Sequence, residues 1–307
     1  MAAIELDGVT KRYGDVRALH DVDLTVGEGE IFGFLGPNGA GKSTTIDILL
    51  DFVRPAAGDV TVLGHDAQAE SRAVRRRTGV LPDGFSVYDR LSGRKHLRLA
   101  IDSKGTDEDI DDLLSRVGIA DAADRPAGDY SKGMAQRLVL AMALVGDPDL
   151  LILDEPSTGL DPNGARRMRE LIRAERDRGA TVFFSSHILE QVEAVCDRVG
   201  ILRGGELVAV DTIEGLREAV GGGDRLTVTV DRVTDGAVAA IERLAGVSGV
   251  TVDGTRLAVD CDDGAKTAVI STLEAEGLTV EDFATTESSL EELFATYTTG
   301  AEAEVET

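Results

Sequence analysis

Nine residues near the N-terminus have the types and spacing of a phosphate-binding loop. They are Gly36, Pro37, Asn38, Gly39, Ala40, Gly41, Lys42, Ser43 and Thr44. They stand between an apolar run, 31–35, and a segment with helical character, 45–50. Glycines let successive backbone N–H groups turn toward phosphate oxygens, and the helix N-terminus adds unpaired donors. The loop therefore predicts a site for the phosphates of a nucleoside triphosphate, with the Lys42 ammonium on the β- and γ-phosphates and the Ser43 hydroxyl on Mg²⁺.

Two adjacent carboxylates follow a second apolar run, 150–153. Asp154 ends this buried strand, and we expect it to hold Mg²⁺ directly or through water. Glu155 comes next and is the candidate general base for the water that attacks the γ-phosphate. Taken alone, the pair also fits two exposed acids that cap a strand.

A third segment, 130–137, combines a serine and a glycine at an expected helix start, which can bind an anion. It resembles the signature motif of ABC-transporter ATPases, whose usual form is Leu-Ser-Gly-Gly-Gln. Ser131 and Gly133 match that form, whereas Lys132 and Met134 depart from it and resemble a variant found in exporter ATPases. The resemblance extends over residues 4 to about 210.

Further roles follow from the resemblance. In this family the signature, here Ser131 to Met134, caps the γ-phosphate that a second copy holds in its phosphate-binding loop (P-loop). The segment 157–161 resembles the D-loop, which places Asp161 at the dimer interface. His187 resembles the switch histidine that contacts the γ-phosphate. The alternative for His187 is a structural role only, as a histidine whose hydrogen bonds are satisfied within the fold.

Tyr13 resembles the aromatic residue that stacks on adenine, although a core aromatic at a strand end is the alternative. Asp83 stands where the family usually carries glutamine and exporter relatives often carry glutamate. An aspartate there can ligate Mg²⁺ but reaches less far. The adjoining segment, 85–88, is expected to form the groove that receives a helix of the membrane subunit.

The composition excludes some functions. Of 307 residues, 56 are acidic and 32 basic, which gives a net charge of −24 and a pI of about 4.5. This balance resembles that of halophile cytosolic proteins, in which salt screens the repulsion. It argues against a nucleic-acid partner, which requires a basic surface. Cys196 and Cys261 lie far apart in the sequence and predict a reducing compartment without a disulfide framework.

Neither a signal peptide nor a membrane span is predicted. The chain begins directly with a strand-like segment, and the longest apolar stretch, 138–145, is too short to cross a bilayer. We therefore expect a cytoplasmic protein. The resemblance implies attachment to the cytoplasmic face of the cell membrane through a separate polytopic permease subunit.

The order of the predicted elements indicates an α/β fold. Alternating strands and helices through the middle of the chain predict a parallel sheet covered by helices. The fold class expected is a P-loop NTPase of ABC type with an antiparallel β subdomain and a helical subdomain, about 88–145. A β-α-β-β-α-β succession after residue 224 adds a C-terminal α+β ferredoxin-like domain.

The predicted domain boundaries follow from a glycine run. Residues 1–220 form the ATPase domain, 221–224 a linker and 225–297 the ferredoxin-like domain. A capped helix is predicted at 288–294, and residues 298–307 are predicted to be a disordered tail.

The function predicted is that of an ATP-binding and ATP-hydrolysing subunit of an ABC exporter, with ATP and Mg²⁺ as ligands and a second copy as partner. A soluble ABC ATPase in translation or DNA repair is the alternative, although such proteins usually carry two cassettes or a long coiled-coil insertion. The segments 88–94 and 130–134 also resemble the ATPase of the copper-processing exporter that serves nitrous-oxide reductase maturation. The ferredoxin-like domain is open to two interpretations, a regulatory ligand-binding module or a packing and dimerisation domain.

Overall fold

The computed structural model describes residues 1–219 and 224–286. The chain divides into two compact units, Met1–Val210 and Asp211–Thr307. Residues 221–223 of the predicted linker lie outside the described residues, and so do the predicted helix 288–294 and the predicted tail.

A six-stranded sheet forms the centre of the first unit, in the order β10-β9-β3-β8-β7-β6. Its strands are β3 (Ile31–Leu35), β6 (Thr78–Leu81), β7 (Leu150–Asp154), β8 (Thr181–Ser186), β9 (Arg198–Arg203) and β10 (Glu206–Asp211). Every residue of β3, β7 and β8 is buried, as expected for parallel strands that are covered on both faces. The rings of Phe32 and Phe34 pack on Phe183 with centroids 6.0 and 5.1 Å apart.

This sheet brings distant segments together at one edge. Strand β8 lies between β3 and β7, and both pairings are parallel. The C-terminal ends of the three strands therefore lie side by side. Gly36 follows β3, Asp154 ends β7 and His187 follows β8, so the topology alone gathers the P-loop, the carboxylate pair and the histidine.

An antiparallel sheet, in the order β2-β1-β4-β5, forms a separate layer. It contains β1 (Ala2–Tyr13), β2 (Val16–Gly27), β4 (Ala57–Val62) and β5 (His65–Asp66). These strands make up the predicted antiparallel β subdomain, and β1 pairs with β2 from Ala2 opposite Gly27 to Tyr13 opposite Val16. Strands β5 and β10 and helix α2 (Ser71–Arg77) were not predicted from the sequence.

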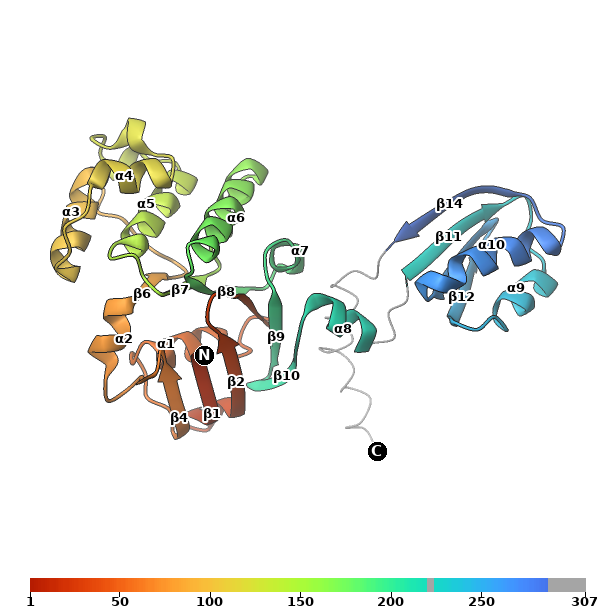
Figure 1. The fold of residues 1–307 in the computed structure, drawn as a ribbon, viewed down its shortest axis with the longest axis horizontal. Coiled ribbons are helices and arrows are strands. Elements are labelled where there is room, and N and C mark those ends of the chain that lie inside the picture. Colours follow the sequence, from red (N-terminus) through yellow and green to blue (C-terminus); the bar gives the residue numbers. More distant parts are fainter. Residues whose placement is uncertain (220–223, 287–307) are drawn as a thin grey trace. The chain divides into compact units, whose positions relative to one another are not determined.

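Helices cover the central sheet and form a group at one end of this unit (Figure 1). They are α1 (Lys42–Leu49), α3 (Gly93–Lys104), α4 (Ile110–Arg116), α5 (Lys132–Leu144), α6 (Pro162–Asp177) and α7 (Leu189–Glu193), with short 3₁₀ turns at Ala120–Ala122 and Ala127–Asp129. Figure 1 shows α3, α4 and α5 together, away from the antiparallel sheet. Ser92 caps α3 by accepting a hydrogen bond from the Lys95 backbone N–H.

The second unit has the predicted ferredoxin-like topology. Its described elements are α8 (Ile213–Ala219), β11 (Asp224–Val230), α9 (Asp235–Ile241), β12 (Val247–Asp253), β13 (Arg256–Cys261), a 3₁₀ turn at Asp263–Ala265, α10 (Lys266–Ala275) and β14 (Val280–Thr286). The sheet order is β12-β13-β11-β14, with antiparallel neighbours. Asp253 pairs with Arg256, so Gly254 and Thr255 form the hairpin turn between β12 and β13.

A buried carboxylate joins the helical group to α6. The Glu175 side chain is only 3% exposed. Its Oε1 accepts a hydrogen bond from Arg116 Nε of α4 at 2.9 Å, and its Oε2 accepts one from Arg178 Nε at 3.1 Å. Both arginines are partly exposed, so the network should stabilise the fold by an amount between that of a surface ion pair and that of a fully buried one.

We expect Glu175→Gln to lower the free energy of unfolding of the first unit by about 2 kcal/mol, between the values typical of exposed and buried pairs. The loss arises because two guanidinium groups keep their charge beside a neutral amide. Urea unfolding of the full chain measures it. Glu170→Gln on the same helix is the control, because Glu170 lies 3.9 Å from Arg166 and both side chains are exposed. Equal effects of the two substitutions would contradict the assignment.

Candidate functional site

Two glycines of the P-loop lie so close to neighbouring backbone that a residue with a Cβ would clash there. Gly41 caps α1 with φ +114°, and a Cβ there would lie 2.7 Å from the Ala18 carbonyl oxygen. A Cβ on Gly36 would lie 2.5 Å from the carbonyl oxygen of Leu202. The loop is therefore packed against the chain on its outer side, and its amides are left for a ligand.

Lys42 is held against the loop that precedes it. Its side chain is buried, and Nζ donates hydrogen bonds to the carbonyl oxygens of Gly36 at 2.6 Å and Pro37 at 3.4 Å. Burial lowers the pKa of Lys42, while the nearby charges of Glu155 and Asp154 act in the opposite direction. The ammonium is thus held in place at the loop, and the two nearby carboxylates offset only part of the cost of burying its charge.

A cavity of about 190 Å³ lies over this loop. It is lined by Ala18, Pro37, Asn38, Gly39, Gly41, Lys42, Ser43, Thr44, Asp83, Asp154 and Glu155. Most of the predicted P-loop residues therefore meet both predicted carboxylates and Asp83 in one place. Gly36 and Ala40 support the loop from outside the cavity lining.

Asp154 is a buried acid with acidic neighbours. Its Oδ1 accepts a hydrogen bond from the Ser185 hydroxyl of the adjacent strand. Burial raises the pKa of Asp154, and the charges of Asp83 and Glu155 raise it further. The hydrogen bond from Ser185 and the charge of Lys42 lower it in part. A bound cation would relieve this repulsion.

The donor set fits Mg²⁺ only in company with a nucleotide. Within residues 1–219 and 224–286, no group of three or more His, Cys, Asp or Glu side chains is arranged to hold a metal ion. Mg²⁺ is commonly held by one or two carboxylates together with substrate phosphates and water. Ser43 and Asp154, with Asp83 beside them, match that pattern.

Glu155 is fixed in an unusual conformation. Its φ is +50°, a left-handed value that costs a non-glycine residue about 1 kcal/mol or more. Oε1 lies 2.8 Å from His187 Nδ1, and Oε2 accepts a hydrogen bond from Thr158 Oγ1 at 3.2 Å. The carboxylate is thus held on both oxygens at the edge of the P-loop cavity.

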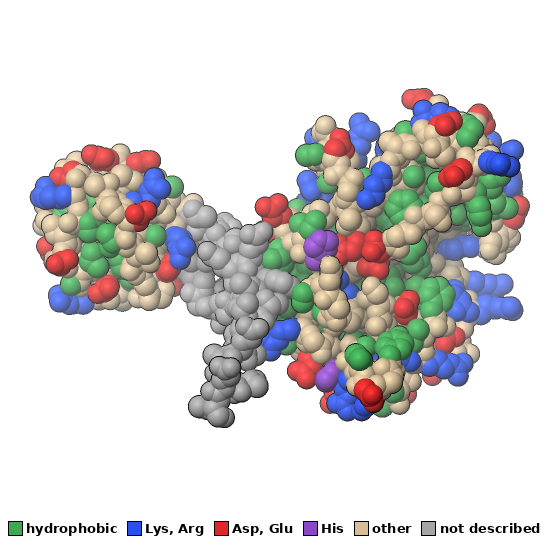
Figure 2. Space-filling view, turned by 180° about the vertical axis from the view of Figure 1, so that it is seen from behind, with side chains coloured by type: hydrophobic (Ala, Val, Ile, Leu, Met, Phe, Trp, Pro, Cys, Tyr) green, Lys and Arg blue, Asp and Glu red, His purple; other side chains and the backbone are tan. Residues whose placement is uncertain are grey.

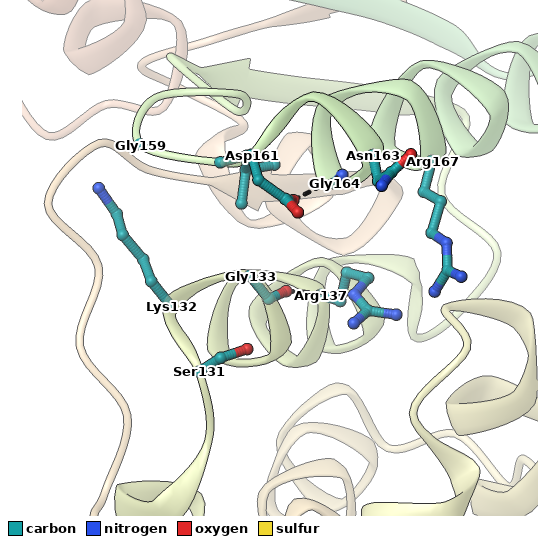
Figure 3. Close-up of a pocket in the computed structure, with 10 residues that line it drawn as sticks. Ser131, Lys132, Gly133, Arg137, Gly159, Asp161, Asn163, Gly164 and Arg167 are labelled. Carbon is teal, nitrogen blue, oxygen red and sulfur yellow. Dashed lines mark hydrogen bonds between the residues drawn. The ribbon is translucent and has the colours of Figure 1, made fainter.

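The signature segment lies at a different cavity. Ser131 caps α5, and its Oγ accepts a hydrogen bond from the Met134 backbone N–H at 3.3 Å. The cavity there measures about 480 Å³ and is lined by Ser131, Lys132, Gly133, Arg137, Gly159, Leu160, Asp161, Asn163, Gly164 and Arg167 (Figure 3). Asp161 caps α6 through the Gly164 N–H at 2.8 Å. Signature and D-loop therefore meet, and no P-loop residue lines their cavity.

Met134 and Tyr13 lie outside both cavity linings. The Met134 sulfur lies 3.1 Å from an Arg125 Nη2. Tyr13 ends β1 with its side chain 48% exposed, and the Lys11 ammonium lies 5.0 Å from its ring centroid. Tyr13 is therefore not a core aromatic, which removes the alternative interpretation of that residue.

Asp83 lies between two cavities. Besides the P-loop cavity, it lines a neighbouring one of about 200 Å³ together with Phe85, Lys132, Gln136 and Glu155. Its Oδ1 accepts a hydrogen bond from the Gly84 N–H at 2.8 Å, which turns the carboxylate back toward its own loop.

Sequence reasoning missed three supporting residues. Ser185 and Thr158 each donate to one of the two carboxylates. Gln136 of α5 is buried and donates to the carbonyl oxygen of Pro156, next to Glu155. The available signal for Ser185 was its position directly after the buried apolar run 182–184.

Figure 2 shows acidic and basic side chains interspersed over the face in view, with a histidine beside a group of acids between the two lobes of the larger body. The negative charge of the chain is therefore not gathered into one patch on this face. Among the described residues no helix is long and apolar enough to cross a membrane.

Comparisons with known proteins identify the family of this chain. Residues 19–158 match the family model described as ABC transporter. The chain is 37% identical to the daunorubicin resistance ATP-binding protein DrrA3 of Streptomyces coeruleorubidus, over 95% of this chain and 94% of that protein. It is 31% identical to the linearmycin resistance ATP-binding protein LnrL of Bacillus subtilis, over 96% and 98% of the two chains.

A solved structure of the ATP-binding subunit of an ABC transporter superposes with a TM-score of 0.66 and 30% identity, over 71% of this chain and 93% of that one. The fold class expected from the sequence is therefore confirmed. The chain belongs to the ABC transporter ATP-binding proteins, and it is an ATPase of that family.

Proposed function

We propose that two copies of this chain enclose two ATP molecules, each between the P-loop of one copy and the signature of the other. One observation carries this proposal: Ser131 and Gly133 line a cavity that contains no P-loop residue. Within one chain the site for the phosphates therefore lacks the signature. A second copy, related by two-fold symmetry, supplies it to both sites at once.

The chemistry assigned to each residue follows from its position. The Lys42 ammonium and the loop amides stabilise negative charge on the β- and γ-phosphate oxygens. Glu155 accepts a proton from the attacking water, because its carboxylate lies at the edge of the same cavity and is oriented by His187 and Thr158. Ser131 and Gly133 of the other copy bind the γ-phosphate with a hydroxyl and an amide.

Ser43, Asp154 and Asp83 are the residues proposed to hold Mg²⁺. When bound, the ion neutralises charge on the phosphate oxygens. His187 holds Glu155 in place and contacts the γ-phosphate, so it responds to hydrolysis. Asp161 lies at the dimer interface. Tyr13, with an exposed ring, stacks on adenine.

The relatives named above support a role in export. One is named for resistance to daunorubicin and the other for resistance to linearmycin, and the similarity extends over nearly the whole chain, including the C-terminal unit. We infer that this chain drives a separate polytopic permease that moves an organic compound out of the cell. The chain itself then lies at the cytoplasmic face of the membrane, bound to the permease in the groove near residues 85–88.

We propose a division of labour between the domains. Residues 1–220 act as the ATPase domain, with a helical subdomain at about 88–145, and 221–224 act as a linker. Residues 225–297 act as the accessory ferredoxin-like domain.

The Glu155→Gln substitution tests the shared site. We expect turnover to fall by at least about 100-fold, the usual contribution of a general base. The glutamine keeps the size of the side chain, so Mg-ATP still binds and a dimer accumulates. Size-exclusion chromatography with light scattering measures the dimer. Glu70→Gln, an exposed acid outside the P-loop cavity, is the control. A Glu155→Gln chain that stays monomeric under saturating Mg-ATP would contradict the proposed dimer.

Identification of co-purified proteins distinguishes a transporter subunit from a soluble ABC ATPase in translation or DNA repair. Purified in detergent from its own cells, the tagged full chain is expected to bring down a polytopic membrane protein in stoichiometric amount. Recovery of ribosomes or DNA-repair proteins in its place contradicts the permease assignment. The strongly acidic surface makes the second result unexpected.

A further inference from the structure

The cavity between the starts of α5 and α6 collects cations in a chain whose net charge is −24. Lys132, Arg137 and Arg167 all line it. Figure 3 shows the guanidinium groups of Arg137 and Arg167 on the same side of the cavity, with Lys132 at the opposite end near Gly159. Acids outnumber bases by 56 to 32 in this chain, so three cations around one cavity is not what composition alone predicts.

The two arginines are not neutralised by partners. Arg137 donates from Nε to the Gly133 carbonyl at 3.2 Å and from Nη1 to the Gly118 carbonyl at 2.8 Å. These acceptors are uncharged, and Nη2 has no bond among the described residues. Arg167 makes no hydrogen bond or ion pair within residues 1–219 and 224–286.

Two acids lie near the pair, and one of them, Glu170, lines a neighbouring cavity of about 310 Å³ together with both arginines. Asp161 accepts the Gly164 N–H at 2.8 Å as the cap of α6, and Glu170 lies 3.9 Å from Arg166. Burial lowers the pKa of Arg137, and the charge of Arg167 lowers it further, with Asp161 acting in the opposite direction. The two guanidinium groups therefore repel each other, and an anion between them would remove that repulsion.

The two arginines follow the helix starts by about two turns, and Arg137 Nε reaches back to the Gly133 carbonyl oxygen at 3.2 Å. Arg137 and Arg167 each stand in the second turn of their helices, about 9 Å along the axis from the capping residues Ser131 and Asp161. The cavity is also much larger than one phosphate, at about 480 Å³. It has room for an anionic group beside the γ-phosphate assigned above to Ser131 and Gly133.

We propose that Arg137 and Arg167 form a second binding site, for a phosphate oxyanion. Guanidinium forks match tetrahedral oxyanions with paired, charge-assisted hydrogen bonds. The ligand has two possible sources: free inorganic phosphate, or a phosphate group of a nucleotide held by a second copy. Only the second source rests on the proposed ATP-bound dimer.

Free phosphate is tested on the nucleotide-free full chain carrying Lys42→Ala, which weakens phosphate binding at the P-loop. Calorimetric titration with inorganic phosphate is expected to show one site. Adding Arg167→Gln should weaken it about tenfold, because a charge-assisted fork is lost. The matched control is Arg166→Gln, since Arg166 precedes it on the same helix but does not line the cavity; it should leave the affinity within about twofold.

Nucleotide phosphate is tested in the Glu155→Gln background. There Arg167→Gln is expected to raise the ATP concentration at half-maximal dimer formation, and Arg166→Gln to leave it unchanged. An effect of Arg167→Gln in either assay supports the site and identifies its source. If Arg167→Gln matches Arg166→Gln in both, the site does not exist. If Glu155→Gln alone fails to dimerise, the dimer proposal fails while the calorimetric result still decides this one.

Discussion

Crowded charge at the end of the central sheet is the constraint on which the rest of this structure depends. Lys42 is buried, yet its ammonium meets only loop carbonyls and the fields of Asp154 and Glu155. Asp154 is buried against further negative charge from Asp83 and Glu155. Such an arrangement costs stability in the free protein. Phosphate oxygens beside Lys42 and a divalent cation beside the acids would remove this electrostatic cost. The charges at this edge therefore favour the ligand-bound state.

The surrounding structure holds this edge in place. The parallel order of β3, β8 and β7 fixes which loops meet. Ser185 orients one carboxylate, and His187 and Thr158 orient the other. Gln136 connects helix α5 to the turn after Glu155 through the Pro156 carbonyl. Helix α5 is therefore joined by a direct hydrogen bond to the turn that carries Glu155.

Much of the fold could be predicted from local sequence. The P-loop, the buried strand before Asp154 and the capped start of α5 are contiguous patterns, so their residues and elements are visible without a structure. The βαββαβ succession also follows from local strand and helix signals, and its sheet order confirmed the fold class. The short strand β5 and helix α2 were missed because their segments have no strong periodicity.

What the sequence could not provide is contact between distant segments. Nothing near Thr158 indicates that its hydroxyl supports Glu155. Arg137 and Arg167 face one cavity only because α5 and α6 begin side by side. The exposure of Tyr13 likewise depends on where β1 ends relative to the rest of its sheet. Each of these depends on tertiary packing, which local patterns do not encode.

Sharing of each ATP site between two copies is the central claim, and mixing two inactive chains tests it most directly. Lys42→Ala disables the P-loop, and Gly133→Asp places a negative charge where the signature would meet phosphate. In a mixed dimer one site carries both defects and the other carries neither. The account predicts recovery of up to about a quarter of the wild-type ATPase rate from an equal mixture, since half the dimers are mixed and each has one intact site. A rate no higher than that of the separate variants would contradict it.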